Sequence, residues 1–230
     1  YDQIIHDVCI QDLPVIFAVD RAGLVGSDGE THQGIFDLSY LTGIPNMHVC
    51  APKNKWELSD MLKFAVNLGK PIAIRYPRGT AYDGLSQYRA PIEMGKAEWI
   101  YKEEYIALFA IGSMVKEAEA VRDTLKEKGY SVSLINARFA KPIDEESVLQ
   151  ACTNHRLIVT MEENVAAGGY GEKVMACLNA NGLKNTLVTI AVPDAYVEHG
   201  NVQLLKQEIG IDTESCVDKI LRGLNVSAES

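Results

Sequence analysis

The residue types best suited to chemistry gather in residues 20–37, which read DRAGLVGSDGETHQGIFD. His32 could exchange a proton near neutral pH, or bind a substrate hydroxyl or carbonyl group. Asp28, four residues earlier, could orient the imidazole or hold a sugar hydroxyl. The alternative is a loop histidine that only makes stabilising hydrogen bonds, and the spacing of these residues leaves both roles open.

Three arginines could form an anion site beside this loop. Arg21 directly follows a short apolar run, and Arg75 and Arg78 lie at the end of another. Parallel strands bring their C-terminal ends to one edge of a sheet, which is where open α/β sheets place ligands. Guanidinium groups suit phosphate because they offer paired donors in a fixed fork. For any one of these arginines taken singly, a surface salt bridge is the better explanation.

Strand and helix patterns alternate along the chain, which predicts parallel sheets that bring these residues to one edge. Predicted strands lie at residues 14–19, 47–51, 71–74, 105–111, 131–135, 157–161 and 187–192. Predicted helices lie at residues 36–41, 54–68, 115–128, 144–151 and 172–180, besides an opening helix and two pieces near the C-terminus. Apolar runs stop near residues 80–98, where Gly, Pro, Ser and Arg appear. We therefore expect an α/β fold with two parallel-sheet domains, residues 1–80 and 99–230, joined by a linker at 81–98.

Two polar motifs in the second half admit simpler explanations than ligand binding. The turn GGYG at residues 168–171 precedes a predicted helix and could cradle a phosphate at the helix N-terminus. It is not a full G-x-G-x-x-G, so close packing of strand on helix explains it better. Glu162, Glu163 and Asn164 follow a predicted strand and are interpreted as polar residues leading into a loop.

Composition narrows the class of protein. The 230 residues carry a formal charge of −9, which argues against nucleic-acid or anionic-membrane binding because both need a basic surface. No apolar run approaches the length of a membrane span. The five cysteines are widely spaced and indicate reduced thiols, with Cys50 and Cys152 filling core positions. The five histidines are also scattered, so no zinc site is expected.

Several longer motifs together resemble one enzyme family. They are DRAGLVGSDGETHQGIFDLSYLTGIPNM, IAIRYPRG, RFAKPID, MEEN with GGYG, and PDAYVEHG. They resemble the 1-deoxy-D-xylulose-5-phosphate synthases, thiamine-diphosphate enzymes related to transketolase and to the pyruvate dehydrogenase E1 subunits. The likeness runs over essentially the whole chain, in the family order. It implies a pyrimidine-binding domain at residues 1–80, truncated at its N-terminus, and a transketolase C-terminal-like domain at 99–230.

The resemblance implies a transferase that condenses two small substrates. Pyruvate is decarboxylated and joined to glyceraldehyde 3-phosphate, and the product feeds isoprenoid, thiamine and pyridoxal synthesis. By motif position, His32 and Asp28 match active-site residues that contact substrate, and Arg21 and Arg78 match arginines that hold the phosphate. The family further implies thiamine diphosphate with Mg²⁺, a homodimer, and a location in the bacterial cytoplasm or the plastid stroma.

The chain also departs from the family pattern. The GDG…N motif for magnesium and the diphosphate, and the Glu that activates the aminopyrimidine, are expected upstream of Tyr1. Tyr1 itself opens the chain within a helical pattern, which indicates a fragment or processed product. We therefore expect this chain to be inactive without the N-terminal half of the same enzyme, and no cofactor ligand within it. Two alternatives stay open: a 2-oxo acid dehydrogenase E1 β-type subunit, and a non-catalytic dimerisation or regulatory module.

Overall fold

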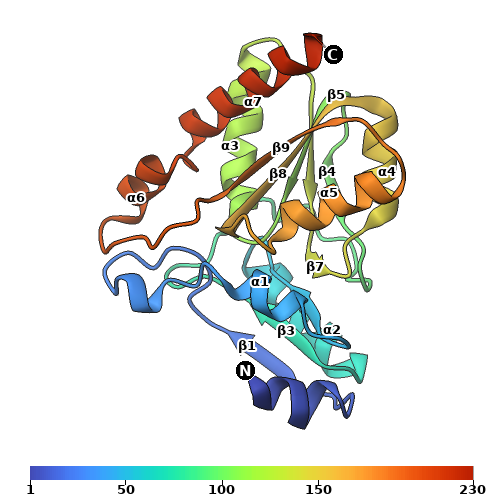
Figure 1. The fold of residues 1–230 in the computed structure, drawn as a ribbon, viewed down its shortest axis with the longest axis vertical. Helices are drawn as coiled ribbons and strands as arrows, with labels where there is room; N and C mark the ends of the chain where they lie inside the picture. The colour runs from blue at the N-terminus through green and yellow to red at the C-terminus, as the bar shows by residue number, and fades with distance from the viewer. Residues whose placement is uncertain (230) are drawn as a thin grey trace.

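The computed structural model describes residues 1–229, which form two sheets with helices packed around them (Figure 1). The first sheet has the order β1-β3-β2-β7, with strands β1 (Ile16–Val19), β3 (Ile72–Arg75), β2 (His48–Cys50) and β7 (Phe139–Lys141). The second has the order β4-β6-β5-β8-β9, with strands β4 (Glu98–Tyr101), β6 (Val132–Asn136), β5 (Tyr105–Ala110), β8 (His155–Val165) and β9 (Thr186–Val192). Both sheets are mainly parallel, which confirms the predicted α/β class.

Helices cover both faces of the second sheet. Helices α3 (Met114–Glu127), α6 (Val202–Ile209) and α7 (Thr213–Glu229) lie on one side, and α4 (Glu145–Asn154) and α5 (Tyr170–Ala180) on the other (Figure 1). Helix α1 (Asp37–Thr42) lies between the two sheets, and α2 (Lys55–Leu68) flanks the first. The chain opens with a π-helix, Ile4–Cys9, and a 3-10 turn, Glu30–His32, lies in the loop before α1. No helix among the described residues has both the length and the apolar character needed to cross a bilayer.

Local sequence explains the boundaries of α2. The side chain of Asn54 accepts a hydrogen bond from the Glu57 amide at 3.0 Å and so caps the helix N-terminus. Gly69 ends the helix in the left-handed conformation, with φ +68°. Burial on both faces likewise explains the central strands, since every residue of β6 is buried.

Two antiparallel edge strands were not predicted. Strand β4 pairs antiparallel with β6, and β7 pairs antiparallel with β2. Strand β7 has only three residues, too few to give a periodic pattern, and its partner lies about 90 residues earlier in the sequence. The purely parallel sheets we expected are therefore mixed at their edges. β7 follows the expected linker yet completes the first sheet, and the domain division at residues 81–98 stays a prediction.

The two halves of the chain share one hydrophobic core. Leu38 of α1 and Val49 of β2 belong to the same buried cluster as Phe109 of β5 and Val174 of α5. Burial of these side chains is the main force holding the first sheet against the second, because the hydrophobic contribution grows with the apolar area removed from water.

A buried ion network also joins the halves. The Glu57 carboxylate on α2 accepts hydrogen bonds from the Lys53 ammonium at 3.1 Å, from Asn136 at 2.9 Å and from the Arg138 Nε at 2.8 Å. Glu98 on β4 pairs with the same two cations, at 2.6 Å from Lys53 and 3.2 Å from Arg138. The four charged side chains are at most 6% exposed. The two positive and two negative charges therefore neutralise one another inside the protein, away from water.

Candidate functional site

Three of the four predicted site residues meet at the C-terminal edge of the first sheet. Val19 and Arg75 end β1 and β3 in register, so the segments that follow leave the sheet side by side. The Arg21 Nε lies 3.5 Å from the Asp28 Oδ2, and the Arg78 guanidinium donates to the same oxygen. Both arginine side chains are nearly half exposed. The sheet edge therefore presents a pair of guanidinium groups that share one carboxylate.

His32 lies on the same loop but makes separate contacts. It is exposed at the end of the 3-10 turn, and its Nδ1 lies 2.9 Å from the Thr31 hydroxyl. Among the described residues, no hydrogen bond joins His32 to Asp28. The imidazole therefore faces solvent, where a substrate group could reach it, and Asp28 orients the two arginines instead of the histidine.

The ends of the loop are tied together by backbone hydrogen bonds. Gly23 and Gly34 exchange two N–H···O bonds of 2.9 Å each. A Cβ on Gly34 would lie 2.1 Å from the Arg21 carbonyl oxygen, so only glycine fits there. Arg21 itself has φ +61°, an unusual value for a residue with a side chain. The tie holds Arg21 in this conformation and so directs its side chain toward Asp28.

Glu163, on β8 of the second sheet, anchors the start of the loop. Its carboxylate accepts from the Leu24 amide at 2.9 Å and from the Ser113 hydroxyl at 2.6 Å, and the side chain is buried. A Cβ on Gly23 would lie 2.3 Å from the Glu163 Cδ. Sequence reasoning missed this anchor, because its partners lie up to 139 positions away.

Gln33, the neighbour of His32, anchors the other side of the loop. Its Oε1 accepts from the Val25 amide at 2.6 Å, and its Nε2 donates to the Glu198 carbonyl at 3.2 Å. The Gly200 amide further donates to the Gly26 carbonyl at 3.1 Å. Residues 197–200, from the motif PDAYVEHG, therefore hold the loop from the second half of the chain.

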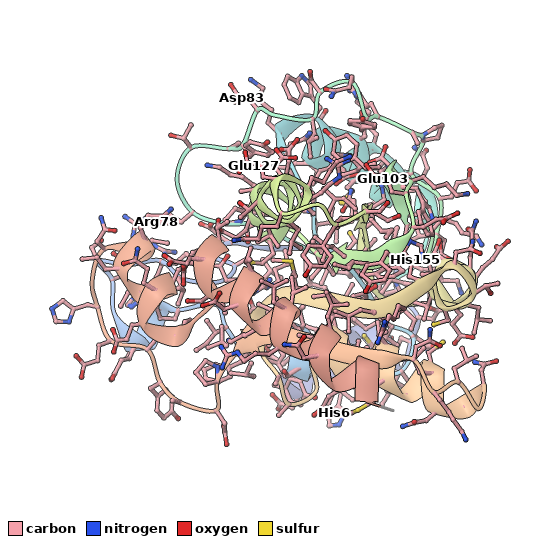
Figure 2. All side chains as sticks on the ribbon, turned by 90° about the horizontal axis from the view of Figure 1, so that it is seen from above. His6, Arg78, Asp83, Glu103, Glu127 and His155 are labelled. Carbon is pink, nitrogen blue, oxygen red and sulfur yellow. The ribbon has the colours of Figure 1, made fainter. Side chains whose placement is uncertain are left out.

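Arg75 does not belong to the anion site. It is 2% exposed, its Nε pairs with Asp37 at 3.1 Å, and its guanidinium donates to the carbonyls of Gly34 and Glu163 at 2.6 and 2.7 Å. All these partners are protein groups, so Arg75 serves as an internal cross-link. His155 has a similar role: it is buried between the Ser133 hydroxyl and the Ala151 carbonyl, and it lies across the molecule from Arg78 (Figure 2).

The acidic end of β8 is a buried strand, so its interpretation as the lead into a loop is wrong. Glu162 is fully buried and accepts from the amides of Tyr170 and Gly171, both at 2.8 Å. Burial raises the pKa of Glu162 to about 7, although these two hydrogen bonds oppose the rise. The Asn164 side chain accepts from the Leu38 amide at 3.0 Å. β8 therefore supplies polar groups that satisfy buried backbone amides.

The GGYG turn cannot cradle a phosphate, because Glu162 already occupies the N-terminus of α5. The packing explanation agrees with the structure: a Cβ on Gly171 would lie 2.6 Å from the Thr189 methyl group and 2.8 Å from the Thr160 hydroxyl. Cys50 is fully buried, whereas Cys152 is half-buried and packs against the shared core.

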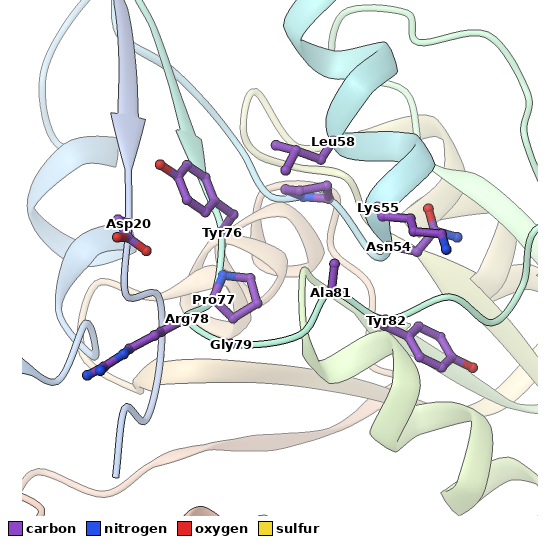
Figure 3. A pocket seen from close by; sticks show the side chains of 11 residues that line it. Asp20, Asn54, Lys55, Leu58, Tyr76, Pro77, Arg78, Gly79, Ala81 and Tyr82 are labelled. Atoms are coloured by element: carbon purple, nitrogen blue, oxygen red, sulfur yellow. The ribbon is translucent and has the colours of Figure 1, made fainter. Parts of the chain in front are cut away.

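A cavity of about 330 Å³ lies beside Arg78 (Figure 3). Its walls include Leu58, Pro77 and Tyr76, and Asp20 lies at its edge. The Arg78 side chain points away from Tyr82 toward the segment after Asp20 (Figure 3). Among the described residues, no group of three or more His, Cys, Asp or Glu side chains is placed to hold a metal ion. The site therefore offers donors for an anion and an exposed imidazole, without a metal centre of its own.

Two protein-family models match the chain. The transketolase pyrimidine-binding domain matches residues 1–82, and the transketolase C-terminal domain matches residues 95–216.

Several curated relatives that are similar to this chain in sequence are 1-deoxy-D-xylulose-5-phosphate synthases. The enzyme of Lachnoclostridium phytofermentans is 53% identical over 225 residues, which cover 96% of this chain and 36% of that protein. The enzyme of Natranaerobius thermophilus is 47% identical, with 97% and 36% covered, and that of Aquifex aeolicus 43% identical, with 96% and 35% covered. These matches confirm the resemblance seen in the motifs. The chain spans about a third of the length of these relatives.

Solved structures show the same fold. A structure described as a split gene transketolase, inactive beta4 tetramer, superposes with a TM-score of 0.88 at 24% identity, covering 98% of this chain and 72% of that one. Transketolase from Campylobacter jejuni superposes with a TM-score of 0.67 at 18% identity, covering 90% and 31%. At these identities the likeness establishes the architecture alone.

Proposed function

The chain belongs to the transketolase family, and from that premise we propose that it forms the C-terminal portion of a 1-deoxy-D-xylulose-5-phosphate synthase. The protein containing it would condense pyruvate, with loss of carbon dioxide, and glyceraldehyde 3-phosphate to 1-deoxy-D-xylulose 5-phosphate. The product supplies isoprenoid, thiamine and pyridoxal synthesis. The bacterial relatives favour the bacterial cytoplasm over a plastid stroma as its location.

The observation that carries this proposal is the convergence of Arg21 and Arg78 on Asp28. The shared carboxylate keeps both guanidinium groups turned to one side before substrate arrives. Asp20 also lies 3.9 Å from Arg21, so two carboxylates balance the two guanidinium groups, and the N–H donors that these carboxylates leave free are available to the phosphate of glyceraldehyde 3-phosphate. Guanidinium matches phosphate geometry and binds it through charge-assisted hydrogen bonds.

The exposed imidazole of His32 completes the proposed substrate site. As the new carbon–carbon bond forms, the aldehyde oxygen of the acceptor gains a proton, and we assign the donation of that proton to His32. Both arginines contact the Oδ2 of Asp28, so among the described residues its Oδ1 is free to accept a hydrogen bond from a substrate hydroxyl. Glu163 and Gln33 hold the loop backbone that positions His32.

Thiamine diphosphate supplies the nucleophilic carbon centre of this reaction when it is bound. The GGYG turn offers no diphosphate cradle, since Glu162 fills the N-terminus of α5. We propose that the ligands of thiamine diphosphate and Mg²⁺ lie mostly in the N-terminal part of the protein, outside this chain. The neighbouring split-gene transketolase is described as an inactive beta4 tetramer, which supports two further parts of the proposal: this chain alone is inactive, and copies of it associate.

The test uses the full-length enzyme, or this chain combined with its N-terminal portion. Arg78→Ala should raise the KM for glyceraldehyde 3-phosphate about 10- to 100-fold and leave that for pyruvate nearly unchanged, because a hydrogen bond to a charged group contributes about 1.5–3 kcal/mol. Arg89→Ala is a matched control, since the Arg89 and Arg78 side chains are equally exposed (47%) and Arg89 pairs with Asp60 away from the loop. Equal effects on both substrates would rule out the phosphate role.

A parallel test concerns His32. His32→Ala in the same assembly should lower kcat by about 100-fold or more, the usual contribution of a general acid. His6→Ala, a change on the opening π-helix, should leave kcat unchanged. Wild-type turnover in His32→Ala would show that the proposed site is wrong. Reductive acylation of a lipoyl domain without ketose formation would instead favour the E1 β-type alternative.

A further inference from the structure

A second cavity, of about 460 Å³, lies beside α5, on the face of the second sheet that faces away from α3. Its walls come from both halves of the chain: Thr42 of α1, the segment from Ala140 to Ile143, and one face of α5. Two lysines line it, Lys141 at the end of β7 and Lys173 on α5. We call it the Lys141–Lys173 cavity.

The two ammonium groups have no counter-charge at ion-pair distance. Lys141 donates to the Ile44 carbonyl, a neutral group, and neither lysine lies within 4 Å of a carboxylate oxygen among the described side chains. Both lysines are half-buried. Burial lowers the pKa of Lys141, and the positive charge of Lys173 lowers it further. Holding two like charges together in a partly desolvated place costs free energy, and no ion pair with either lysine among the described side chains offsets it.

The acidic groups nearest to these lysines are engaged elsewhere. Glu162 accepts from the amides at the start of α5, and Glu172 accepts from the Gly168 amide at 2.7 Å. Their charges raise the pKa of Lys173, against the lowering effect of burial. Glu162 and Glu172 do not line the cavity, whereas Glu145 lines it and is exposed. Glu162 and Glu172 act on Lys173 without forming an ion pair with it, so both ammonium groups can still take an anion as a direct partner.

We propose that the Lys141–Lys173 cavity binds a small phosphate monoester. Two lysines favour a dianion over a carboxylate, because each ammonium is a compact point charge and both must be neutralised. The other walls are largely apolar, with Pro142, Ile143 and Ala176, and they suit a short carbon body attached to the phosphate. A volume of about 460 Å³ lies in the range of small-molecule sites. The site is separate from the Arg21 and Arg78 pair and does not depend on the proposed function.

The test measures binding of three probes to the 230-residue chain by calorimetry: phenyl phosphate, benzoate and inorganic phosphate. Phenyl phosphate should bind more tightly than either of the others, since it alone combines a dianion with an apolar body. Lys173→Met should weaken it by about tenfold or more, the effect of losing a charge-assisted hydrogen bond. Lys173 is half-buried and Met keeps its apolar stem, so this variant should fold. All three probes are measured in the Arg78→Ala background, which removes the other anion site, so that only binding at the Lys141–Lys173 cavity is measured.

A cavity-filling pair provides an independent readout. Ala176→Phe keeps both lysines but fills the cavity, and in the Arg78→Ala background it should abolish binding of phenyl phosphate. Met175→Phe is the matched control, because Met175 is the neighbouring residue on α5, is 47% exposed and does not line the cavity. The proposal is wrong if no probe binds, if Lys173→Met binds as the wild type does, or if Ala176→Phe and Met175→Phe bind equally. Loss of binding in Arg78→Ala alone would assign the phosphate to the first site.

Discussion

Replacing Glu57 by Gln should destabilise the protein more than any single surface change. The substitution keeps the side-chain shape but removes one of four balanced buried charges, leaving Lys53 and Arg138 opposite Glu98 alone. Breaking a buried ion pair by removing one partner costs about 3–5 kcal/mol, because the uncompensated charge remains desolvated. That loss is a large share of the roughly 5–15 kcal/mol by which folded proteins are stable.

Urea unfolding at pH 7 measures this loss as a shift in the transition midpoint. The surface control is Glu146→Gln, since Glu146 is 81% exposed and pairs with Lys96 at 2.7 Å; its effect should stay below about 1 kcal/mol. The double change Lys53→Met with Glu57→Gln restores charge balance and should cost less than the sum of the two single changes. If Glu57→Gln and Glu146→Gln shifted the midpoint equally, the reasoning from buried charge would be refuted.

Three further predictions concern the loop and its anchors. Gly23→Ala should destabilise by about 1–2 kcal/mol from its φ of +76° alone, and by more because the new Cβ meets Glu163. Gln33→Leu should cost about 1–3 kcal/mol and speed hydrogen exchange at the Val25 amide, which loses its buried acceptor. Glu162 has a pKa of about 7 in the fold, above its ordinary value of 4.5, so its stability contribution is full below pH 4.5 and is lost as pH rises through 7. Glu162→Gln should remove that part of the pH dependence, about 3 kcal/mol between pH 4 and 8.

Each of these predictions has its own contrary outcome. Gly69→Ala is the control for Gly23→Ala, because Gly69 has a similar φ of +68° and nothing within 4 Å of the added Cβ. An equal loss of stability in both variants would mean that the Glu163 side chain moves aside for the new Cβ at no cost in free energy. Unchanged exchange at Val25 in Gln33→Leu would show that Gln33 does not hold the loop. A constant stability difference between Glu162→Gln and the wild type across pH would contradict the raised pKa.

Local sequence patterns were sufficient for most of the fold, because the signals act over a few residues. Apolar runs identified the central strands, and Asn54 and Gly69 marked the ends of α2 as cap and left-handed terminator. The convergence of Arg21 and Arg78 also followed from sequence, since each lies just beyond a parallel strand. Strand β7 could not be found in this way, because three residues carry no period and its pairing is long-range.

The tertiary structure alone decided which polar residues lie at the open edge of the first sheet and which are internal. Arg75 and Arg78 are three positions apart. Arg75, the last residue of β3, is enclosed by Asp37 and two backbone carbonyls, whereas Arg78 reaches the open edge of the first sheet. Glu162 and Glu163 are of a residue type that is common in exposed loops, but both side chains are buried. The amides that they satisfy come from the start of α5 and from the loop after β1. A buried polar group is stable only when a partner reaches it, and such distant partners are brought near only by the folded chain.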